Sequence, residues 1–238
     1  MQTRLETKSQ LPTEAGENLK PIDIDNLRFL IHAYDAKFGE DLLWTNQVFR
    51  VRADFQNKVL KYFLPSSPKD LLLFIPNAGP KPEDLGKYVM ATWRQVDLFT
   101  QNGRVPLSWI SLLNRCKSET AYPENIFVEE NIALPSVTSR RIERRLLEKR
   151  FRITSSTNVI VGGEYTDKCV VGAVVDLLSL PQINEVLLDT RVILGPTEYV
   201  KQNYAPAGSL EAFGETMIDL GHSVTPQRGS PYISVTNL

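Results

Sequence analysis

The feature that most constrains the fold is a change in hydrophobic pattern near residue 153. Before this point, apolar residues recur at the three- and four-residue spacing of a helix face. The clearest such face begins near Asp25, and it consists of Leu27, Leu30, Ile31, Tyr34 and Phe38. After residue 153, runs rich in β-branched residues alternate with turn formers, and residues 159–161 and 169–175 are predicted to be strands. The pattern predicts an α+β fold, with a helical N-terminal two-thirds, a smaller mixed β/α C-terminal part and extended terminal arms.

Other segments are predicted from the same signals. Further helices are expected at residues 85–99, 106–116, 124–134, 136–152, 183–187 and 210–220. A strand is expected at residues 191–194. Residues 49–55 fit either a short strand or the start of a helix that continues to Phe63, and residues 71–75 form a buried element of either type.

These elements divide the chain into four parts. Residues 1–20 are polar and contain few apolar anchors, so they are predicted to be an extended arm. Residues 21–152 are predicted to form a mainly helical domain, and residues 153–221 a mixed β/α domain. Residues 222–238 contain two prolines and a glycine and are predicted to be an extended C-terminal tail. Ordered polar arms favour a neighbouring subunit on which they lie.

Composition limits the class of protein and its compartment. Hydrophobic residues make up 42% of the 238 residues and charged residues 23%, which is typical of a globular protein with a real core. No apolar run has the length of a membrane span, and the N-terminus has no apolar stretch typical of a secretion signal. Cys116 and Cys169 lie far apart without metal-ligand spacing, so they are predicted to be two reduced, buried thiols. We therefore expect a cytoplasmic protein with no membrane partner.

A cluster of basic residues lies just before the change in pattern. Seven of the 27 Lys and Arg residues fall between positions 140 and 152, on a chain whose net charge is −1. On a helix, Ile142, Leu146 and Phe151 would face the core and the cations would project away from it. Arginine presents a planar donor group that matches phosphate and carboxylate. The sequence therefore predicts a site for nucleic acid or another anion formed by Arg140, Arg141, Arg144, Arg145, Lys149 and Arg152.

The residues around this cluster resemble a helix-turn-helix motif. Its packing positions would fall on Ala133, Val137, Ile142 and Leu146. The spacing from Ala133 to Val137 is one residue shorter than the usual motif, and the glycine of the turn is absent. A β-hairpin over residues 158–175 would correspond to the wing of a winged-helix domain. The resemblance implies that the helix at residues 136–152 enters a DNA groove.

Signals for an enzyme are few. The chain has two histidines, and it contains no G-x-S-x-G, H-E-x-x-H or C-x-x-C motif. We therefore predict no catalytic residue, metal or cofactor. The leading hypothesis is a non-enzymatic nucleic-acid-binding protein. The alternative is a structural subunit of a larger assembly, such as a viral, phage or secretion-type complex, in which the arms and basic helix contact neighbouring subunits. Either hypothesis implies a nucleic acid or an acidic protein surface as partner, and an oligomer or multi-subunit complex.

Overall fold

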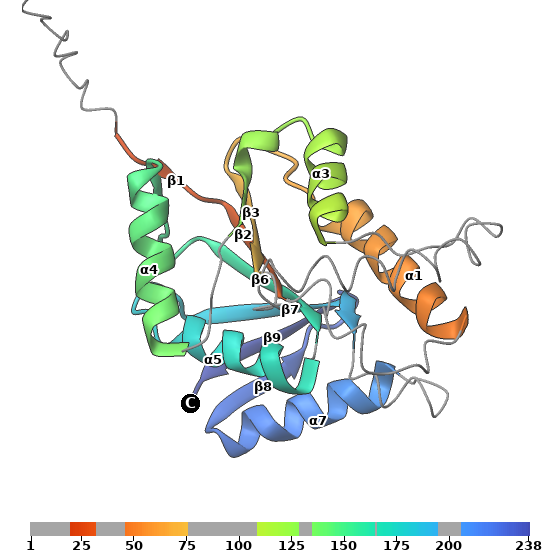
Figure 1. Cartoon of the computed structure of the whole chain (residues 1–238). Helices are drawn as coiled ribbons and strands as arrows, with labels where there is room; N and C mark the ends of the chain where they lie inside the picture. The colour runs from red at the N-terminus through yellow and green to blue at the C-terminus, as the bar shows by residue number, and fades with distance from the viewer. Residues whose placement is uncertain (1–19, 32–45, 76–108, 129–134, 165, 195–205) are drawn as a thin grey trace, which may run out of the picture.

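The computed structural model describes residues 20–31, 46–75, 109–128, 135–164, 166–194 and 206–238. At its centre is a seven-stranded sheet with the strand order β4-β3-β2-β6-β7-β9-β8 (Figure 1). Its strands are β2 (Asn26–Ile31), β3 (Asp70–Ile75), β4 (Ile126–Val128), β6 (Asn158–Glu164), β7 (Glu185–Leu194), β8 (His222–Pro226) and β9 (Tyr232–Asn237). The five strands from β4 to β7 are parallel, and β9 and β8 are antiparallel to their neighbours. A separate pair joins β1 (Ile22–Asp23) to β5 (Phe151–Arg152).

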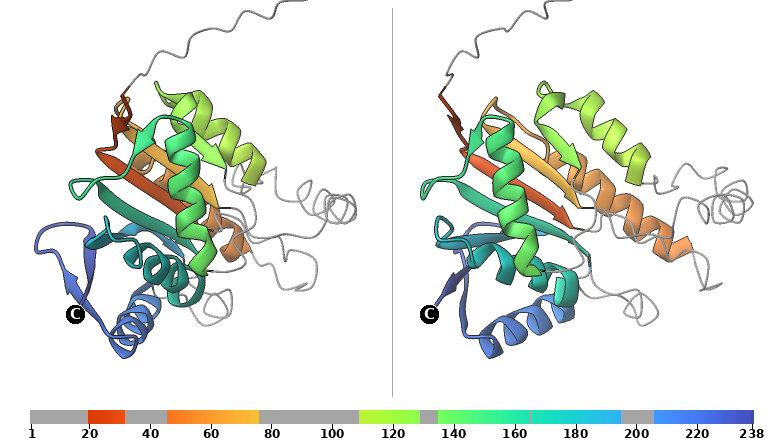
Figure 2. Two further views of the ribbon diagram at one scale, coloured as in Figure 1. Left: turned by 90° about the vertical axis from the view of Figure 1, so that its left-hand side faces the viewer. Right: turned by 60° about the vertical axis from the view of Figure 1, so that its left-hand side comes forward.

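Helices cover both faces of the sheet (Figure 2). One face carries α1 (Asn46–Tyr62) and α3 (Trp109–Glu119), whose apolar residues pack on Leu30, Leu72 and Phe74. The other face carries α4 (Pro135–Glu148), α5 (Val171–Leu178) and α7 (Pro206–Asp219). Short helical turns lie at Pro123–Asn125 and Thr166–Val170. The architecture is therefore an α/β fold of three layers. Among the described residues, none of the helices has both the length and the hydropathy to cross a bilayer.

The predicted fold class was wrong, because the N-terminal two-thirds of the chain contains strands β2, β3 and β4 of the main sheet. The expected helix after Asp25 is in fact β2, in which Leu27, Phe29, Leu30 and Ile31 are all buried. A central parallel strand is covered on both faces, so its residues read as an apolar run rather than as an alternation. The spacing of leucine and isoleucine in such a short run also fits a helix face.

Three further element predictions were wrong for related reasons. Ile126–Val128, expected to be helical, is an edge strand. The expected helix at residues 183–187 contains the start of β7. Residues 169–175 were expected to form a strand, but they are helical. Val170, Val171 and Val174 in this segment are buried in the main core. Burial of one helical face has overridden the preference of valine for strands.

Other element predictions were confirmed. Helices α3, α4 and α7 overlap the predicted ones, and β6 includes the predicted strand at residues 159–161. The helical alternative for residues 49–63 is correct, and residues 71–75 belong to a strand. The predicted helix at residues 85–99 lies outside the described residues. The change in pattern near residue 153 coincides with the crossover from the β2-β3-β4 half of the sheet to the half that begins with β6.

The C-terminal residues complete the sheet. The segment from His222 to Asn237 forms the hairpin β8–β9, and β9 pairs with β7 along Asp189 to Glu185. Val235 at its centre is fully buried in the main core. The predicted tail is extended, and it pairs with the sheet of its own chain.

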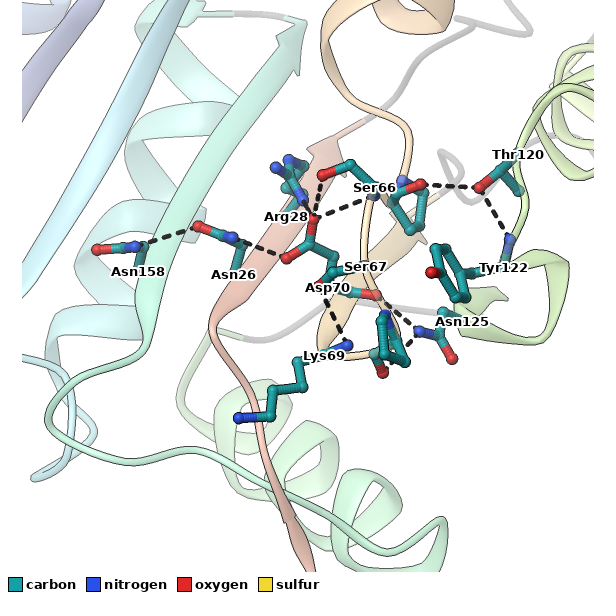
Figure 3. Close-up of polar contacts among 12 residues, drawn as sticks. Asn26, Arg28, Ser66, Ser67, Lys69, Asp70, Thr120, Tyr122, Asn125 and Asn158 are labelled. Carbon is teal, nitrogen blue, oxygen red and sulfur yellow. Dashed lines mark hydrogen bonds and ion pairs between the residues drawn. The ribbon is translucent and has the colours of Figure 1, made fainter.

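Polar side chains fix the start of three neighbouring strands (Figure 3). Asn26, Asp70 and Asn158 are the first residues of β2, β3 and β6, and they stand opposite one another in the sheet. The Asn158 amide donates to Asn26 Oδ1 at 3.1 Å, and the Asn26 amide donates to Asp70 Oδ1 at 2.7 Å. Asp70 is buried and ion-paired with Arg28 at 3.3 Å. This polar ladder specifies the register of the three strands, because a one-residue slip would separate its members.

Candidate active site

The order in which the chain adds strands to the sheet reverses between β2 and β6. The chain places β3 and then β4 outward on one side of β2, and it returns through α4 to place β6 and then β7 on the other side. The next described helices after β2 and β6, which are α1 and α5, pack on opposite faces of the sheet. In open parallel α/β sheets, ligands bind in the crevice outside the carboxyl ends of the strands at such a switch point. This end of β6 is the candidate site.

Two glycines let three strands approach closely at this end of β6. A Cβ atom on Gly163 would lie 2.0 Å from the Ile31 carbonyl oxygen of β2, and one on Gly162 would lie 2.6 Å from the Val192 oxygen of β7. Gly163 also has a φ of +129°, which L side chains rarely adopt. Backbone conformations of this kind cluster at functional sites.

The pairing of β6 with β7 is irregular at the same point. Val161 pairs with Leu188 and Gly163 pairs with Ile193, so β6 advances two residues while β7 advances five. Within the bulged stretch of β7, the Arg191 guanidinium binds the carboxylate of buried Asp189 through two hydrogen bonds of 2.8 and 2.6 Å. Bulges are enriched beside active sites, where they change the direction of the chain and of its side chains.

Aromatic rings hold the bulged stretch of β7 in place. The Arg191 guanidinium lies 4.2 Å from the ring centroid of Tyr62, at the end of α1, and 5.4 Å from that of Tyr232 in β9. The hydrogen bonding that Arg191 donates to Asp189 raises the pKa of Arg191; partial burial opposes this shift, and the charge of Asp189 adds to it. Contacts from α1 and β9 therefore stabilise the bulged stretch of β7.

A helical segment begins at Thr166, two residues after the end of β6. Thr166–Val170 forms a single π-helical segment, which continues as α5. Such wide turns are rare and occur frequently at functional sites. The Thr166 side chain is fully buried, and its hydroxyl donates to the Leu194 carbonyl of β7 at 3.1 Å. Helix α7 packs against the same segment.

Cys169 lies on this first turn. It is partly exposed and packs against the main core, whereas Cys116 in α3 is fully buried. Burial, followed by the charge of Glu119, raises the pKa of the Cys116 thiol to about 12, so Cys116 remains protonated at neutral pH. The prediction of two buried thiols is correct for Cys116 and wrong for Cys169.

The location of Cys169 favours a reactive thiol. The first N–H groups of a helix have no acceptor within the helix, and they give its N-terminus a partial positive charge. A thiolate at such a position is stabilised relative to a buried one. Among the described residues, no group of three or more His, Cys, Asp or Glu side chains could hold a metal ion.

The basic residues predicted to form an anion site are on α4 and just after it. The side chains of Arg140 and Arg141 lie outside the described residues. Arg144, whose side chain is 82% exposed, pairs with Glu148 at 3.1 Å on the same helix. Arg145 Nη1 donates to the Val128 carbonyl of β4 at 3.4 Å, and Lys149 Nζ lies 4.7 Å from the centroid of the Phe127 ring. Both side chains thus contact the edge strand β4.

Arg152 is engaged in the small β1–β5 sheet. Its guanidinium donates to Asp23 at 2.7 Å, and this hydrogen bond lowers the pKa of the Asp23 carboxyl. The four described cations of the predicted site therefore all have contacts within the chain. Whether they also meet an acidic partner, and whether the chain is oligomeric, stays a prediction.

The resemblance to a helix-turn-helix motif is not supported by the structure. In the predicted helix at residues 124–134, which would hold Ala133 of the motif, residues 126–128 form a strand, and residues 129–134 lie outside the described residues. The predicted wing over residues 158–175 is instead the central parallel strand β6 followed by a helix. Helix α4 is a crossover connection that packs on the sheet through Ile142 and Leu146.

Sequence reasoning missed the site at the end of β6. Its signal was present: a β-branched run at residues 159–161, then Gly162 and Gly163, then a threonine three residues before a cysteine. The predicted β-hairpin over residues 158–175 instead places the paired glycines in a turn between two strands. Assignment of that segment to a helix would have placed Cys169 at a strand-to-helix junction.

Comparisons with known proteins add one structural likeness. No protein-family model matches the sequence, and no curated protein matches it. A search of solved structures finds the crystal structure of a pyrazinamidase/nicotinamidase from Streptococcus mutans UA159, with a TM-score of 0.43 and 14% sequence identity. The match covers 81% of this chain and 97% of that one.

The hypothesis of a non-enzymatic nucleic-acid-binding protein or assembly subunit loses its structural basis in the described residues. Residues 126–128, expected to be helical, form a strand, and the C-terminal arm belongs to the sheet. A likeness with a TM-score of 0.43 assigns no reaction to this chain, which is similar to that protein only in part.

Proposed function

We propose that the chain is an enzyme that acts on a small molecule, with the thiol of Cys169 as its nucleophile. The observation that carries the proposal is the location of Cys169 on the first helical turn after the central strand β6, at the switch point of the sheet. The glycine pair, the bulge in β7 and the π-helical turn support it, because such irregularities concentrate at functional sites.

The reaction class follows from the chemistry of a thiolate. A thiolate attacks an electrophilic carbon, and the carbonyl of an amide or ester is the substrate class that it serves in covalent catalysis. The sulfur–carbon bond forms, the amine or alcohol leaves with a proton, and a thioester remains on Cys169. Water then attacks the thioester, releases the acid and restores the thiol. The helix N-terminus favours the negative charge that develops during both attacks.

The proposal includes a reducing compartment, in agreement with the predicted cytoplasmic location. A partly exposed catalytic thiol stays reduced in the cytosol, where glutathione and thioredoxin oppose disulfide formation.

Alkylation of the purified protein with iodoacetamide at pH 7 tests the proposal without a known substrate. We expect Cys169 to be modified rapidly and Cys116 to remain unmodified in the folded protein, as read by peptide mass spectrometry. Hydrolysis of small amides and esters is then compared between the wild type, Cys169→Ala and Cys116→Ala. Loss of a catalytic nucleophile lowers the rate by about a thousandfold or more.

The matched variant Cys116→Ala should retain hydrolysis, because Cys116 lies in α3 on the opposite face of the sheet. Equal hydrolysis by Cys169→Ala and the wild type would show that another group is the nucleophile. Slow, equal alkylation of the two cysteines would show that Cys169 is not activated.

A further inference from the structure

The Thr166 hydroxyl makes a hydrogen bond that is not needed to form the helical turn in which Thr166 lies. A threonine at the start of a helix ordinarily accepts from a nearby backbone N–H as a cap. Thr166 instead donates to the Leu194 carbonyl at 3.1 Å, from a side chain that is 0% exposed. The hydrogen bond joins residues 28 positions apart in the sequence, and it therefore connects the π-helical turn to β7.

The two ends of this bond belong to the irregular region around β6. Leu194 is the last residue of β7 and pairs with Glu164 beyond the bulge. Thr166 is the first residue of the π-helical turn that carries Cys169. The pairing of β6 with β7 shifts register between Val161 and Gly163, so the regular ladder before the bulge does not by itself determine where the helix begins.

We propose that Thr166 is a positioning residue that fixes the first turn of the helix against β7 and thereby holds the Cys169 thiol at the switch point. The inference rests on the proposed function of Cys169. The hydroxyl acts through the backbone of the turn and contacts no substrate. Its loss should therefore lower the reactivity of Cys169 while the fold is retained.

The test uses Thr166→Val and Thr166→Ser. Valine has nearly the shape of threonine but cannot donate, and serine retains the hydroxyl. We expect Thr166→Val to lower the rate constant for alkylation of Cys169 by iodoacetamide at pH 7 by about three- to tenfold, the effect of one buried hydrogen bond. Thr166→Ser should react within about twofold of the wild type by the same reasoning.

A matched control comes from the opposite end of β6. The Thr157 hydroxyl donates to the Ile24 carbonyl at 2.8 Å, across 133 positions of sequence, just before β6 begins. Thr157→Val should lower the melting temperature, as Thr166→Val does, but should leave the alkylation rate of Cys169 unchanged. If Thr166→Val does not fold, the same comparison between Thr166→Ser and Thr166→Ala replaces it.

The outcomes separate this inference from the proposed function. Rapid alkylation of Cys169 in both the wild type and Thr166→Val would overturn the positioning role and leave the nucleophile in place. An equal loss of rate in Thr157→Val, or in Thr166→Ser, would also overturn it, since general loosening would then explain the effect. A wild-type Cys169 that reacts no faster than Cys116 would overturn the proposed function, and the inference with it.

Discussion

At the scale of single residues, Gly163 tolerates a side chain least among the glycines whose surroundings the structure describes. Its φ of +129° excludes most L residues, and the nearest obstacle to a Cβ atom is the backbone oxygen of Ile31 rather than a mobile side chain. A backbone obstacle can be relieved only by separating β2 from β6. The close approach of these two strands at the switch point therefore depends on this one residue.

We expect Gly163→Ala to lower the free energy of unfolding by about 3 kcal/mol or more, because it combines backbone strain with a clash between strands. Chemical denaturation measures this value. Gly172 in α5 provides the control, since its added Cβ would have no atom within 4 Å. Gly172→Ala should raise the stability by about 0.5–1 kcal/mol through helix propensity. Similar changes in the free energy of unfolding for Gly163→Ala and Gly172→Ala would contradict the close approach of β2 and β6.

At the scale of elements, the starts of three strands depend on Asp70. Burial alone would raise the pKa of the Asp70 carboxyl, but hydrogen bonds from Asn26 and Ser66 and the charge of Arg28 outweigh it, and the pKa is lowered. Ser66 contributes both its hydroxyl, at 2.7 Å, and its backbone N–H, at 3.1 Å. The native state therefore favours the ionised carboxylate.

This pKa shift predicts a pH-dependent stability. Because the native pKa lies below the value of 3.8 for a free carboxyl, the contribution is fully present above that value and is lost as the pH falls through the native pKa. Asp70→Asn should cost about 3 kcal/mol at neutral pH, since it leaves the charge of Arg28 without its partner. The difference from the wild type should shrink below pH 3.8.

Urea unfolding at a series of pH values measures this difference. Asp25→Asn is the control, because the pair of Asp25 with Lys69, at 3.7 Å, is exposed. It should change the free energy of unfolding by less than about 0.5 kcal/mol at neutral pH. A cost of Asp70→Asn that stays constant from neutral to acidic pH would contradict the role of the charge.

The elements differ in how far the sequence determines them. Helices α4 and α7 were predictable, because each is amphipathic and long enough for a repeated period. Strand β2 was not, since four of its six residues are buried in a sheet whose other strands lie far along the chain. The candidate site could not be predicted from the sequence for the same reason. The helical turn that carries Cys169 contacts β6 and α7, and Thr166 in the same turn is hydrogen-bonded to Leu194 of β7, so only tertiary structure brings its neighbours together.

At the scale of the whole molecule, the hairpin β8–β9 covers the edge of β7. Without it, the backbone of Val186, Leu188 and Asp189 would form an open edge on a parallel sheet. Natural sheets rarely leave such an edge unprotected, because it pairs with other chains.

A chain that ends at Gly221 should therefore aggregate. We expect its soluble yield to fall severely on expression, and light scattering should show large species in the soluble remainder. Removal of Leu238 alone is the control, because that residue is 90% exposed. A monomeric, soluble chain ending at Gly221 with an unchanged melting temperature would show that the hairpin is dispensable.

The central position of β2 has a consequence for synthesis on the ribosome. Among the strands of the main sheet that the structure describes, β2 emerges first, yet one of its two neighbours, β6, begins 132 residues later. Pairing with β3 leaves the other edge of β2 open while the residues up to β6 are translated. Contacts of such separation form slowly, and an open edge in a nascent chain invites wrong pairing. The growing chain would therefore benefit from a chaperone until β6 fills its place.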